Sequence, residues 1–235
     1  MNYKYIESYS INPFYNLAKE KVLFNYVDDE TSIIFLWQNE HTIFIGKNQN
    51  VYSEVNVKEF LNDGGKIARR LSGGGAVYHD LGNLCFSIIS KRGANTIKYN
   101  DLIIGVLKRF GINATYNGRN DIMVNNKKIS GNAFYENDEV CCQHGTLLVF
   151  INSNCLSKYL TPEQSKLARN GVKSISSRTI NLTEIDSTVS IGKIKKEIIQ
   201  YLFATKFDTK IDKKRISNLQ KCFSSQKWIF EGEPK

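Results

Sequence analysis

Residues 69–83 read Arg-Arg-Leu-Ser-Gly-Gly-Gly-Ala-Val-Tyr-His-Asp-Leu-Gly-Asn, with three consecutive glycines between two apolar stretches. Glycines let a backbone approach a ligand closely and aim bare N–H groups at it. The preceding arginines add positive charge and a fork of donors that suits phosphate or carboxylate groups. The stretch lacks the Gly-Lys-Ser/Thr of a Walker loop and does not open a helix as a G-x-G-x-x-G loop does. It predicts an anion-binding loop between two strands.

Strand and helix patterns surround this loop on both sides. Apolar, β-branched runs predict strands over residues 31–37, 41–46, 66–70, 84–90, 112–116, 121–124, 128–135 and 146–151. Helical spacing and N-cap signals predict helices that follow Asn12-Pro13 and Thr161-Pro162 or span residues 55–62, 99–110 and 190–203. The short link over 38–40 predicts a hairpin of the first two strands, and Asn125-Asn126 predicts a tight turn. We therefore predict an α+β fold, with a mixed, largely antiparallel β-sheet and packed helices.

The chain has the length and composition of one globular domain. Its 235 residues are 41% hydrophobic and 23% charged, and no linker, repeat or low-complexity tract divides them. We expect a single domain over residues 1–235, with the basic, polar stretch from about 206 to 235 at its periphery. No apolar run approaches the roughly 20 residues of a membrane helix. No secretory signal is apparent at the start.

Lysine and arginine outnumber aspartate and glutamate by 32 to 23, which gives a net charge of +9. Between residues 64 and 135, the stretch that holds the glycine-rich loop, the ratio is eleven to three. Such charge favours an anionic ligand, an acidic partner protein or nucleic acid, and alone it does not choose among them. The five cysteines are odd in number and form no C-x-x-C pair, which argues against disulfides and zinc and indicates reduced thiols in the cytoplasm.

A second polar segment, residues 118–133, reads Gly-Arg-Asn-Asp-Ile-Met-Val-Asn-Asn-Lys-Lys-Ile-Ser-Gly-Asn-Ala. Its two predicted strands can turn a carboxylate and a lysine toward one cavity if their register allows it. Asp121 would then hold a metal ion or a ligand hydroxyl, and Lys128 would neutralise a phosphate. The alternative is a surface hairpin with solvated lysines. A third segment, residues 142–146, contains His144, which either lines a pocket or is structural.

These segments together resemble the lipoate–protein ligase A family. The resemblance rests on residues 69–83, on Gly-Arg-Asn-Asp at 118–121, on Lys-Ile-Ser-Gly-Asn-Ala at 128–133 and on His-Gly-Thr-Leu-Leu at 144–148. Weaker matches in 12–20, 35–50 and 176–182 extend the likeness over nearly the whole chain. It implies the catalytic-domain fold of biotin and lipoate ligases.

Members of that family activate lipoate with ATP and Mg²⁺ to give lipoyl-AMP, and then transfer the lipoyl group to a lysine of an acceptor protein. The resemblance therefore implies a cytoplasmic ligase whose partners are lipoate and acceptor proteins, namely E2 lipoyl domains and the glycine-cleavage H protein. It implies neither a nucleic acid nor a membrane as partner.

The resemblance also implies a set of site residues. Lys128 is the expected catalytic residue, a fixed cation at the lipoate carboxylate and the α-phosphate, and Asp121 is the expected Mg²⁺ ligand. ATP is expected to contact Arg70, Gly75, Ala76, Val77, Tyr78, Asn83, Asp121 and Lys128. Lipoate is expected to contact Arg70, Ser72, Gly74, His79, Cys85, Lys128, Gly131, Ala133, His144, Gly145 and Thr146.

Family members continue past a Trp-containing segment, here residues 226–232, into a small accessory domain that supports adenylation, whereas this sequence stops at Lys235. Three alternatives stay open: the domain follows in a longer chain, it is a separate accessory-domain protein, or the protein works without it. Transfer from preformed lipoyl-AMP is the activity we expect of the catalytic domain alone.

Two other functions stay open. An octanoyl or lipoyl transferase shares this architecture and uses a cysteine acyl-enzyme, for which Cys85, Cys141 and Cys142 are candidates. A non-catalytic basic module would bind nucleic acid with a steep salt dependence, or would only hold lipoate. The segments at 72–77 and 118–121 favour the ligase over the transferase, and the strand-like spacing of the aromatic residues is typical of core packing rather than base stacking.

Overall fold

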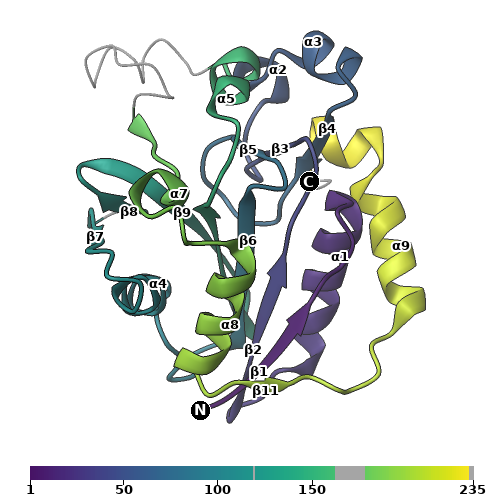
Figure 1. Cartoon of the computed structure of the whole chain (residues 1–235). Coiled ribbons are helices and arrows are strands. Elements are labelled where there is room, and N and C mark those ends of the chain that lie inside the picture. Colours follow the sequence, from purple (N-terminus) through teal and green to yellow (C-terminus); the bar gives the residue numbers. More distant parts are fainter. Residues whose placement is uncertain (119, 162–177, 233–235) are drawn as a thin grey trace.

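The computed structural model describes residues 1–118, 120–161 and 178–232, and within them the chain forms two β-sheets (Figure 1). The larger sheet has eight strands, in spatial order β11 (Thr205–Lys206), β1 (Asn2–Glu7), β2 (Thr31–Trp37), β6 (Asn83–Lys91), β10 (Val140–Leu148), β9 (Lys127–Glu136), β8 (Asp121–Val124) and β7 (Thr115–Tyr116). The smaller sheet has three, β4 (Lys66–Arg69), β3 (Thr42–Ile45) and β5 (Val77–His79).

In the larger sheet, β1 pairs in parallel with β2 and β11, and the other described pairs are antiparallel. The described helices are α1 (Pro13–Leu23), α2 (Val51–Glu54), α3 (Val57–Asn62), α4 (Tyr99–Lys108), α5 (Ser153–Tyr159), α7 (Leu182–Ile185), α8 (Ile191–Tyr201) and α9 (Lys213–Phe223), with the short turns η1 (Phe24–Tyr26) and η3 (Lys227–Glu231). The prediction of a mixed, largely antiparallel sheet with packed helices is confirmed.

Helices cover both faces of the larger sheet, with α1 and α9 on one side and α4 and α8 on the other (Figure 1). Successive side chains of a strand point to opposite faces. In β2, Ile34 and Leu36 pack with α4 and α8, whereas Ile33 and Phe35 pack with α1 and α9. Because both faces are covered, this strand is a continuous apolar run rather than an alternating one.

The helix starts follow local capping signals. The Asn12 side chain accepts hydrogen bonds from the first backbone N–H groups of α1, and Pro13 occupies the position where no N–H is needed. Ser190 caps α8 in the same way. Within the described part of the chain, no helix is both long enough and apolar enough to cross a bilayer.

The smaller sheet has an apolar core of its own. Ile43 and Ile45 of β3 pack with Phe60 of α3 and with Leu156 and Tyr159 of α5. The glycine-rich segment, residues 70–76, connects β4 to β5 of this sheet. The segment therefore crosses the end of β3, and its Ser72 hydroxyl contacts His144 of the larger sheet.

The predicted hairpin over residues 31–46 is wrong. Strand β2 belongs to the larger sheet and β3 to the smaller one, because residues 38–41 carry the chain from one sheet to the other. At this crossing, His41 takes a left-handed conformation with φ of +36°. Local propensity identifies both strands, but their partners lie far along the chain.

Other differences concern whole elements and their boundaries. The sequence patterns did not predict strands β1, β5 and β11 or helices α2, α5, α7 and α9. Strand β10 begins at Val140 rather than at 146, and the strand predicted over 112–116 shortens to β7. Glycine-rich and polar stretches weaken a strand signal even where a partner strand stabilises the pairing. The helix predicted after Thr161-Pro162 falls outside the described residues.

The C-terminal stretch, predicted to be peripheral, is well packed over the residues that the structure describes. Helix α9 lies along α1 (Figure 1), and Phe223 and Trp228 are buried in the core under α1. The Arg69 guanidinium donates to the carbonyl oxygens of Trp228 and Ile229 at 3.1 and 3.0 Å. In return, the Trp228 indole donates to the Arg69 carbonyl at 3.0 Å. This turn therefore stabilises the end of β4.

Phe203 follows α8 directly, with φ of +49° and 89% of its surface exposed. A side chain with a Cβ is strained in this left-handed conformation, where glycine is preferred. We expect Phe203→Gly to raise the free energy of unfolding by about 0.5–1 kcal/mol, because it relieves strain and uncovers no core. Urea denaturation measures the change. Phe203→Ala keeps the Cβ and is the control; an equal gain from both variants would rule out strain as the cause.

Candidate functional site

A cavity of about 770 Å³ lies between the two sheets and is bounded by the glycine-rich segment. Its walls come from β5 of the smaller sheet, from β6, β8, β9 and β10 of the larger one, and from α1 and α5. The polar lining includes Arg70, His79, Asn83, Asn120, Asp121, Lys128, Asn132, His144 and Arg178. The apolar lining includes Leu17, Trp37, Phe44, Leu148, Leu156 and Leu160.

The strand register brings residues from distant parts of the sequence to one wall of this cavity. Directly opposed residues on neighbouring strands share a face of the sheet. One row crosses five neighbouring strands through the opposed residues Trp37, Cys85, Thr146, Gly131 and Asp121. All five line the cavity. The wall therefore runs from an aromatic side chain at one end to a carboxylate at the other.

A β-bulge brings Lys128 to the same wall. In a regular strand Lys128 and Gly131, three positions apart, would point to opposite faces. The register of β9 against β8 shifts at this point, and both Ile129 and Ser130 pack toward α4. The bulge therefore directs the Lys128 side chain toward the cavity. A Cβ on Gly131 would lie 2.7 Å from the Lys128 Nζ, so this glycine leaves room for the lysine.

Lys128 and Asp121 form an ion pair in the cavity. The Lys128 Nζ lies 2.8 Å from the Asp121 Oδ1, and the side chains are 33% and 31% exposed. A pair with this much solvent contact adds little stability and can open to receive a ligand. The prediction that this carboxylate and this lysine face one cavity is confirmed.

The Arg70 guanidinium holds the glycine-rich segment in shape. Its Nη2 donates to the carbonyl oxygens of Gly73 and Gly75, both at 2.7 Å, and its Nη1 donates to the Phe44 carbonyl at 3.3 Å. Its Nε donates to the Ser72 hydroxyl at 3.1 Å. Burial lowers the pKa of Arg70 to about 10, which still leaves it charged at neutral pH. Most of its five N–H donors are therefore used by the protein itself.

The glycine-rich segment rests directly on Gly46, at the end of β3. A Cβ at Gly46 would lie 2.2 Å from the Gly74 carbonyl oxygen. Gly74 itself has a φ of +93°, which favours glycine. Beside this contact, the Lys47 N–H donates to the Ser72 carbonyl at 2.8 Å. The path of the segment therefore depends on two glycines from different parts of the chain.

His79 and Cys85 lie side by side in the lining, with the His79 Nδ1 3.3 Å from the Cys85 Sγ. Burial, together with the Arg70 charge, lowers the pKa of His79 to about 3, so its ring is neutral. Burial and the Glu20 charge raise the pKa of the Cys85 thiol far above its ordinary value. A protonated thiol beside a neutral imidazole is not an activated nucleophile.

Two groups of side chains carry atoms that could bind a metal ion. Asp121 offers a carboxylate, and Asn83 offers a buried Oδ1 with no hydrogen-bond partner, which suits Mg²⁺ held mainly by phosphate oxygens. Glu20, Cys142 and His144 place their ligand atoms within 4.8 Å of one another. Burial raises the pKa of Cys142 well above its ordinary value, and Glu20 already accepts from the His144 ring, so this second group is a hydrogen-bonded cluster.

In the described part of the chain, four buried side-chain polar atoms have no hydrogen-bond partner. They are the His79 Nε2, the Asn83 Oδ1, the Asn132 Oδ1 and the Arg178 Nη2, and all four residues line the cavity. Each such atom costs free energy and is rare in folded proteins. Their concentration at one cavity indicates a polar ligand that completes their hydrogen bonds.

The structure brings the predicted site residues together. Each residue predicted to contact ATP or lipoate lines the cavity, except Ser72. Ser72 is buried behind the wall, with its hydroxyl 2.6 Å from the His144 Nε2. The lining also includes residues that were not predicted, among them Trp37, Phe44, Asn132, Arg178 and Thr179. The family resemblance covered Arg178 and could have identified it, whereas the two aromatic residues are indistinguishable from core in sequence.

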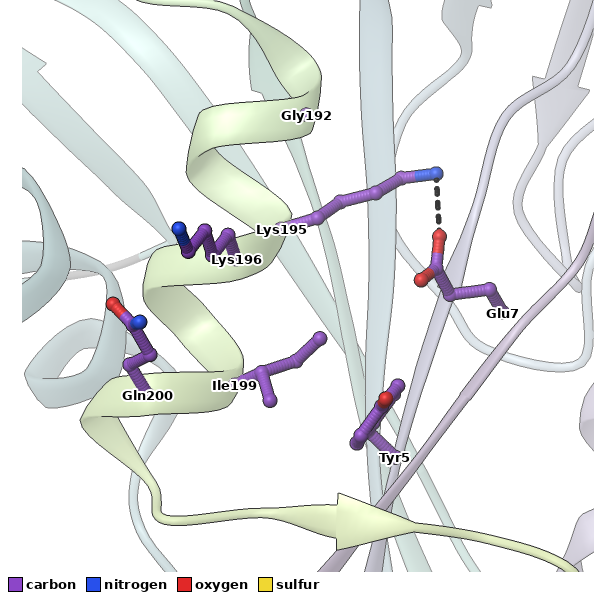
Figure 2. Close-up of a pocket in the computed structure, with 7 residues that line it drawn as sticks. All are labelled: Tyr5, Glu7, Gly192, Lys195, Lys196, Ile199 and Gln200. Carbon is purple, nitrogen blue, oxygen red and sulfur yellow. Dashed lines mark hydrogen bonds and ion pairs between the residues drawn. The ribbon is translucent and has the colours of Figure 1, made fainter.

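A second hollow, of about 500 Å³, lies between α8 and β1 (Figure 2). Its main polar contact is the ion pair between the Lys195 Nζ and the Glu7 Oε2, 3.1 Å apart. Lys196 points away from this pair in Figure 2. The four unpartnered atoms all lie elsewhere, so the cavity between the sheets is the candidate site.

Comparison with known proteins identifies the class of protein that this fold and cavity define. Residues 12–203 match the family model described as the lipoyl protein ligase A/B catalytic domain, and the chain belongs to this family. The resemblance found in the sequence is therefore confirmed.

Individual relatives agree with this assignment. Lipoate–protein ligase 1 of Plasmodium falciparum is 41% identical over 214 residues, which cover 91% of this chain and 52% of the relative. Lipoate-protein ligase A of Blochmanniella floridana is 37% identical over 243 residues, which cover 97% of this chain and 72% of the relative. The crystal structure of Plasmodium falciparum LipL1 in complex with lipoate matches with a TM-score of 0.80 and 34% identity, over 100% of this chain and 75% of that one. This chain spans about half the length of the Plasmodium ligase.

Contact between Gly46 and the glycine-rich segment can be tested by a single methyl group. We expect Gly46→Ala to lower the melting temperature by roughly 4–8 °C, because its Cβ meets backbone that must shift. Differential scanning calorimetry measures the change. Gly75→Ala is the matched control in the same segment, since a Cβ there meets nothing within 4 Å. Equal melting temperatures for the two variants would contradict the close approach.

Proposed function

We propose that this chain is the catalytic part of a lipoate–protein ligase, which activates lipoate with ATP and transfers the lipoyl group to a lysine of an acceptor protein. The observation that supports this proposal most directly is the polar cavity. It contains four unpartnered buried atoms, and one of its walls runs from Trp37 to Asp121. Lipoate has the matching character, with a carboxylate at one end and an apolar ring at the other. The lipoate complex of the Plasmodium relative supports the same ligand.

In the proposed first step, the lipoate carboxylate attacks the α-phosphate of ATP and pyrophosphate leaves. Two anions approach each other, so cations and backbone N–H groups are needed to stabilise the transition state. Lys128 lies at the charged end of the wall and acts as a fixed cation between the two reacting groups. Arg70 supplies charge from behind the glycine-rich segment, whose N–H groups of residues 75–78 face the nucleotide.

Asp121 and Asn83 would hold Mg²⁺ together with phosphate oxygens. When bound, the ion neutralises phosphate charge. For Asp121 to take this role, its ion pair with Lys128 opens, which frees the lysine for the carboxylate and the α-phosphate. In the complex, Asp121 would interact with Mg²⁺, and Lys128 would interact with the lipoate carboxylate and the α-phosphate.

The apolar end of the cavity is proposed to hold the lipoyl ring and chain among Trp37, Phe44 and Cys85, with Thr146 and His144 on the same wall. In the second step the nucleophile is a lysine of the acceptor, an E2 lipoyl domain or H protein, so the enzyme needs no nucleophile of its own. The net charge of +9 would speed encounter with an acidic acceptor. The free thiols fit a cytoplasmic setting.

The direct test is pyrophosphate release by the 235-residue chain with ATP, lipoate and Mg²⁺. Release supports activation by the catalytic domain alone. Transfer from added lipoyl-AMP without such release supports the second step and assigns activation to a further domain or a separate accessory-domain protein. Failure of both reactions would refute the proposal.

Lys128→Ala should lower the rate of lipoyl-AMP formation by about 10²–10³-fold, because it removes a cation from the transition state. The melting temperature should change little, since the ion pair with Asp121 is partly exposed. Radiolabelled AMP transfer measures the rate. Lys196→Ala, in the second hollow, is the matched control and should keep the wild-type rate. A Lys128→Ala rate near that of the wild type would remove Lys128 from the mechanism.

The second candidate function is an acyl transferase that uses a cysteine nucleophile. Of the three candidate cysteines, Cys85 is the one that lines the cavity. Because burial keeps this thiol protonated, we expect Cys85→Ser to retain lipoyl transfer within about tenfold of the wild type. A thiol acyl-enzyme would instead lose nearly all activity and would appear as a covalent adduct by mass spectrometry. Detection of that adduct on Cys85 would favour the transferase.

A further inference from the structure

A chain of hydrogen bonds runs from helix α1 to the glycine-rich segment. The Glu20 Oε1 lies 3.0 Å from the His144 Nδ1, and the His144 Nε2 lies 2.6 Å from the Ser72 hydroxyl oxygen. That oxygen accepts from the Arg70 Nε at 3.1 Å, and the same guanidinium donates to two carbonyls of the segment. Glu20 and the segment are thus connected through three intervening side chains.

In one arrangement of protons that satisfies this chain, His144 is neutral. Arg70 donates to the Ser72 oxygen, so the hydroxyl directs its own proton to the His144 Nε2. The imidazole then carries its proton on Nδ1 and donates it to Glu20. Every link then has one donor and one acceptor, so each of the three contacts is a hydrogen bond.

The chain also connects two buried opposite charges. Glu20 is 2% exposed and Arg70 is 7% exposed, and an isolated charge in such surroundings is costly. Burial alone would raise the pKa of Glu20, but His144 and the hydrogen bonds from Ser87 and Cys142 outweigh it and lower this pKa. Glu20 is therefore ionised and offsets the guanidinium through the intervening groups.

Arg70 and His144 line the cavity, whereas Glu20 lies outside its lining. We propose that Glu20 is a positioning residue, which acts through His144 and Ser72 to hold Arg70 and thereby fixes the glycine-rich segment in its ligand-binding shape. This positioning role follows from the contacts of Glu20, His144, Ser72 and Arg70 and does not depend on the proposed function. Only its consequence for ATP use rests on the proposed function.

Glu20→Gln is the decisive variant, because it keeps the shape of the side chain and removes its charge. We expect amide hydrogen exchange of residues 72–76 to rise about tenfold or more, while exchange in β6 stays unchanged. In pyrophosphate release, the KM for ATP should rise by about the same factor and the KM for lipoate by less than about twofold.

Ser87→Ala is the matched control. Ser87 also donates to the Glu20 carboxylate but does not belong to the chain that reaches Arg70. Because Ser87→Ala keeps the Glu20 charge and its contact with His144, this variant should leave the amide exchange of residues 72–76 and the KM for ATP within about twofold of the wild type.

Ser72→Ala is a second variant, which interrupts the chain while leaving the Glu20–His144 pair in place. It should raise the amide exchange of residues 72–76 as much as Glu20→Gln does. The double variant should exchange no faster than either single one, because both changes act on Arg70 through the same chain.

The proposal would be overturned if amide hydrogen exchange of residues 72–76 were equal in Glu20→Gln and Ser87→Ala. It would also be overturned if the effects of Glu20→Gln and Ser72→Ala on this exchange were additive. A KM increase confined to lipoate would likewise overturn it and make Glu20 part of the acyl pocket. Absence of both reactions in the wild type would refute the proposed ligase instead, and segment exchange would still decide the positioning role.

Discussion

Two neighbouring guanidinium groups, those of Arg69 and Arg70, must find hydrogen-bond acceptors inside the protein, because both side chains are buried. A buried cation without acceptors would cost far more than a typical domain can tolerate. Arg69 is satisfied by carbonyls at the end of β3 and in η3, and Arg70 by carbonyls of the glycine-rich segment. Three stretches that are remote in sequence consequently fold around one dipeptide.

The larger sheet supplies the opposite wall, and its chemistry depends on register. One cross-strand row sets the aromatic end and the carboxylate end at a fixed separation, and the bulge in β9 adds Lys128 to the charged end. Without that extra residue, Lys128 would point toward α4 and Asp121 would lack its partner. A single irregularity in pairing therefore decides whether this wall can receive an anion.

Much of this organisation is predictable from the sequence. Apolar periodicity identified α1, α3, α4, α8 and most strands of the two sheets but missed α9. The glycine-rich and 118–133 segments identified most of the cavity lining. The hairpin at 31–46 failed because strand propensity does not encode which distant strand is the partner. The sequence did not identify Trp37 and Phe44 as lining residues. An aromatic residue in a strand gives the same apolar pattern whether its side chain fills the core or lines a cavity. Glu20, as a helical acid, gave no sign that it would be ionised inside the protein.

Arg69 and Arg70 point to opposite sides at the end of β4, because successive side chains of a strand alternate in direction. An inserted or deleted residue within β4, before the two arginines, would exchange the directions of the two guanidinium groups, so that each would face the acceptors of the other. Substitutions along residues 71–76 alter the segment locally, whereas a change of length would misplace η3 and the cavity together. Grafting a foreign loop into this position therefore has to preserve residue count before residue identity.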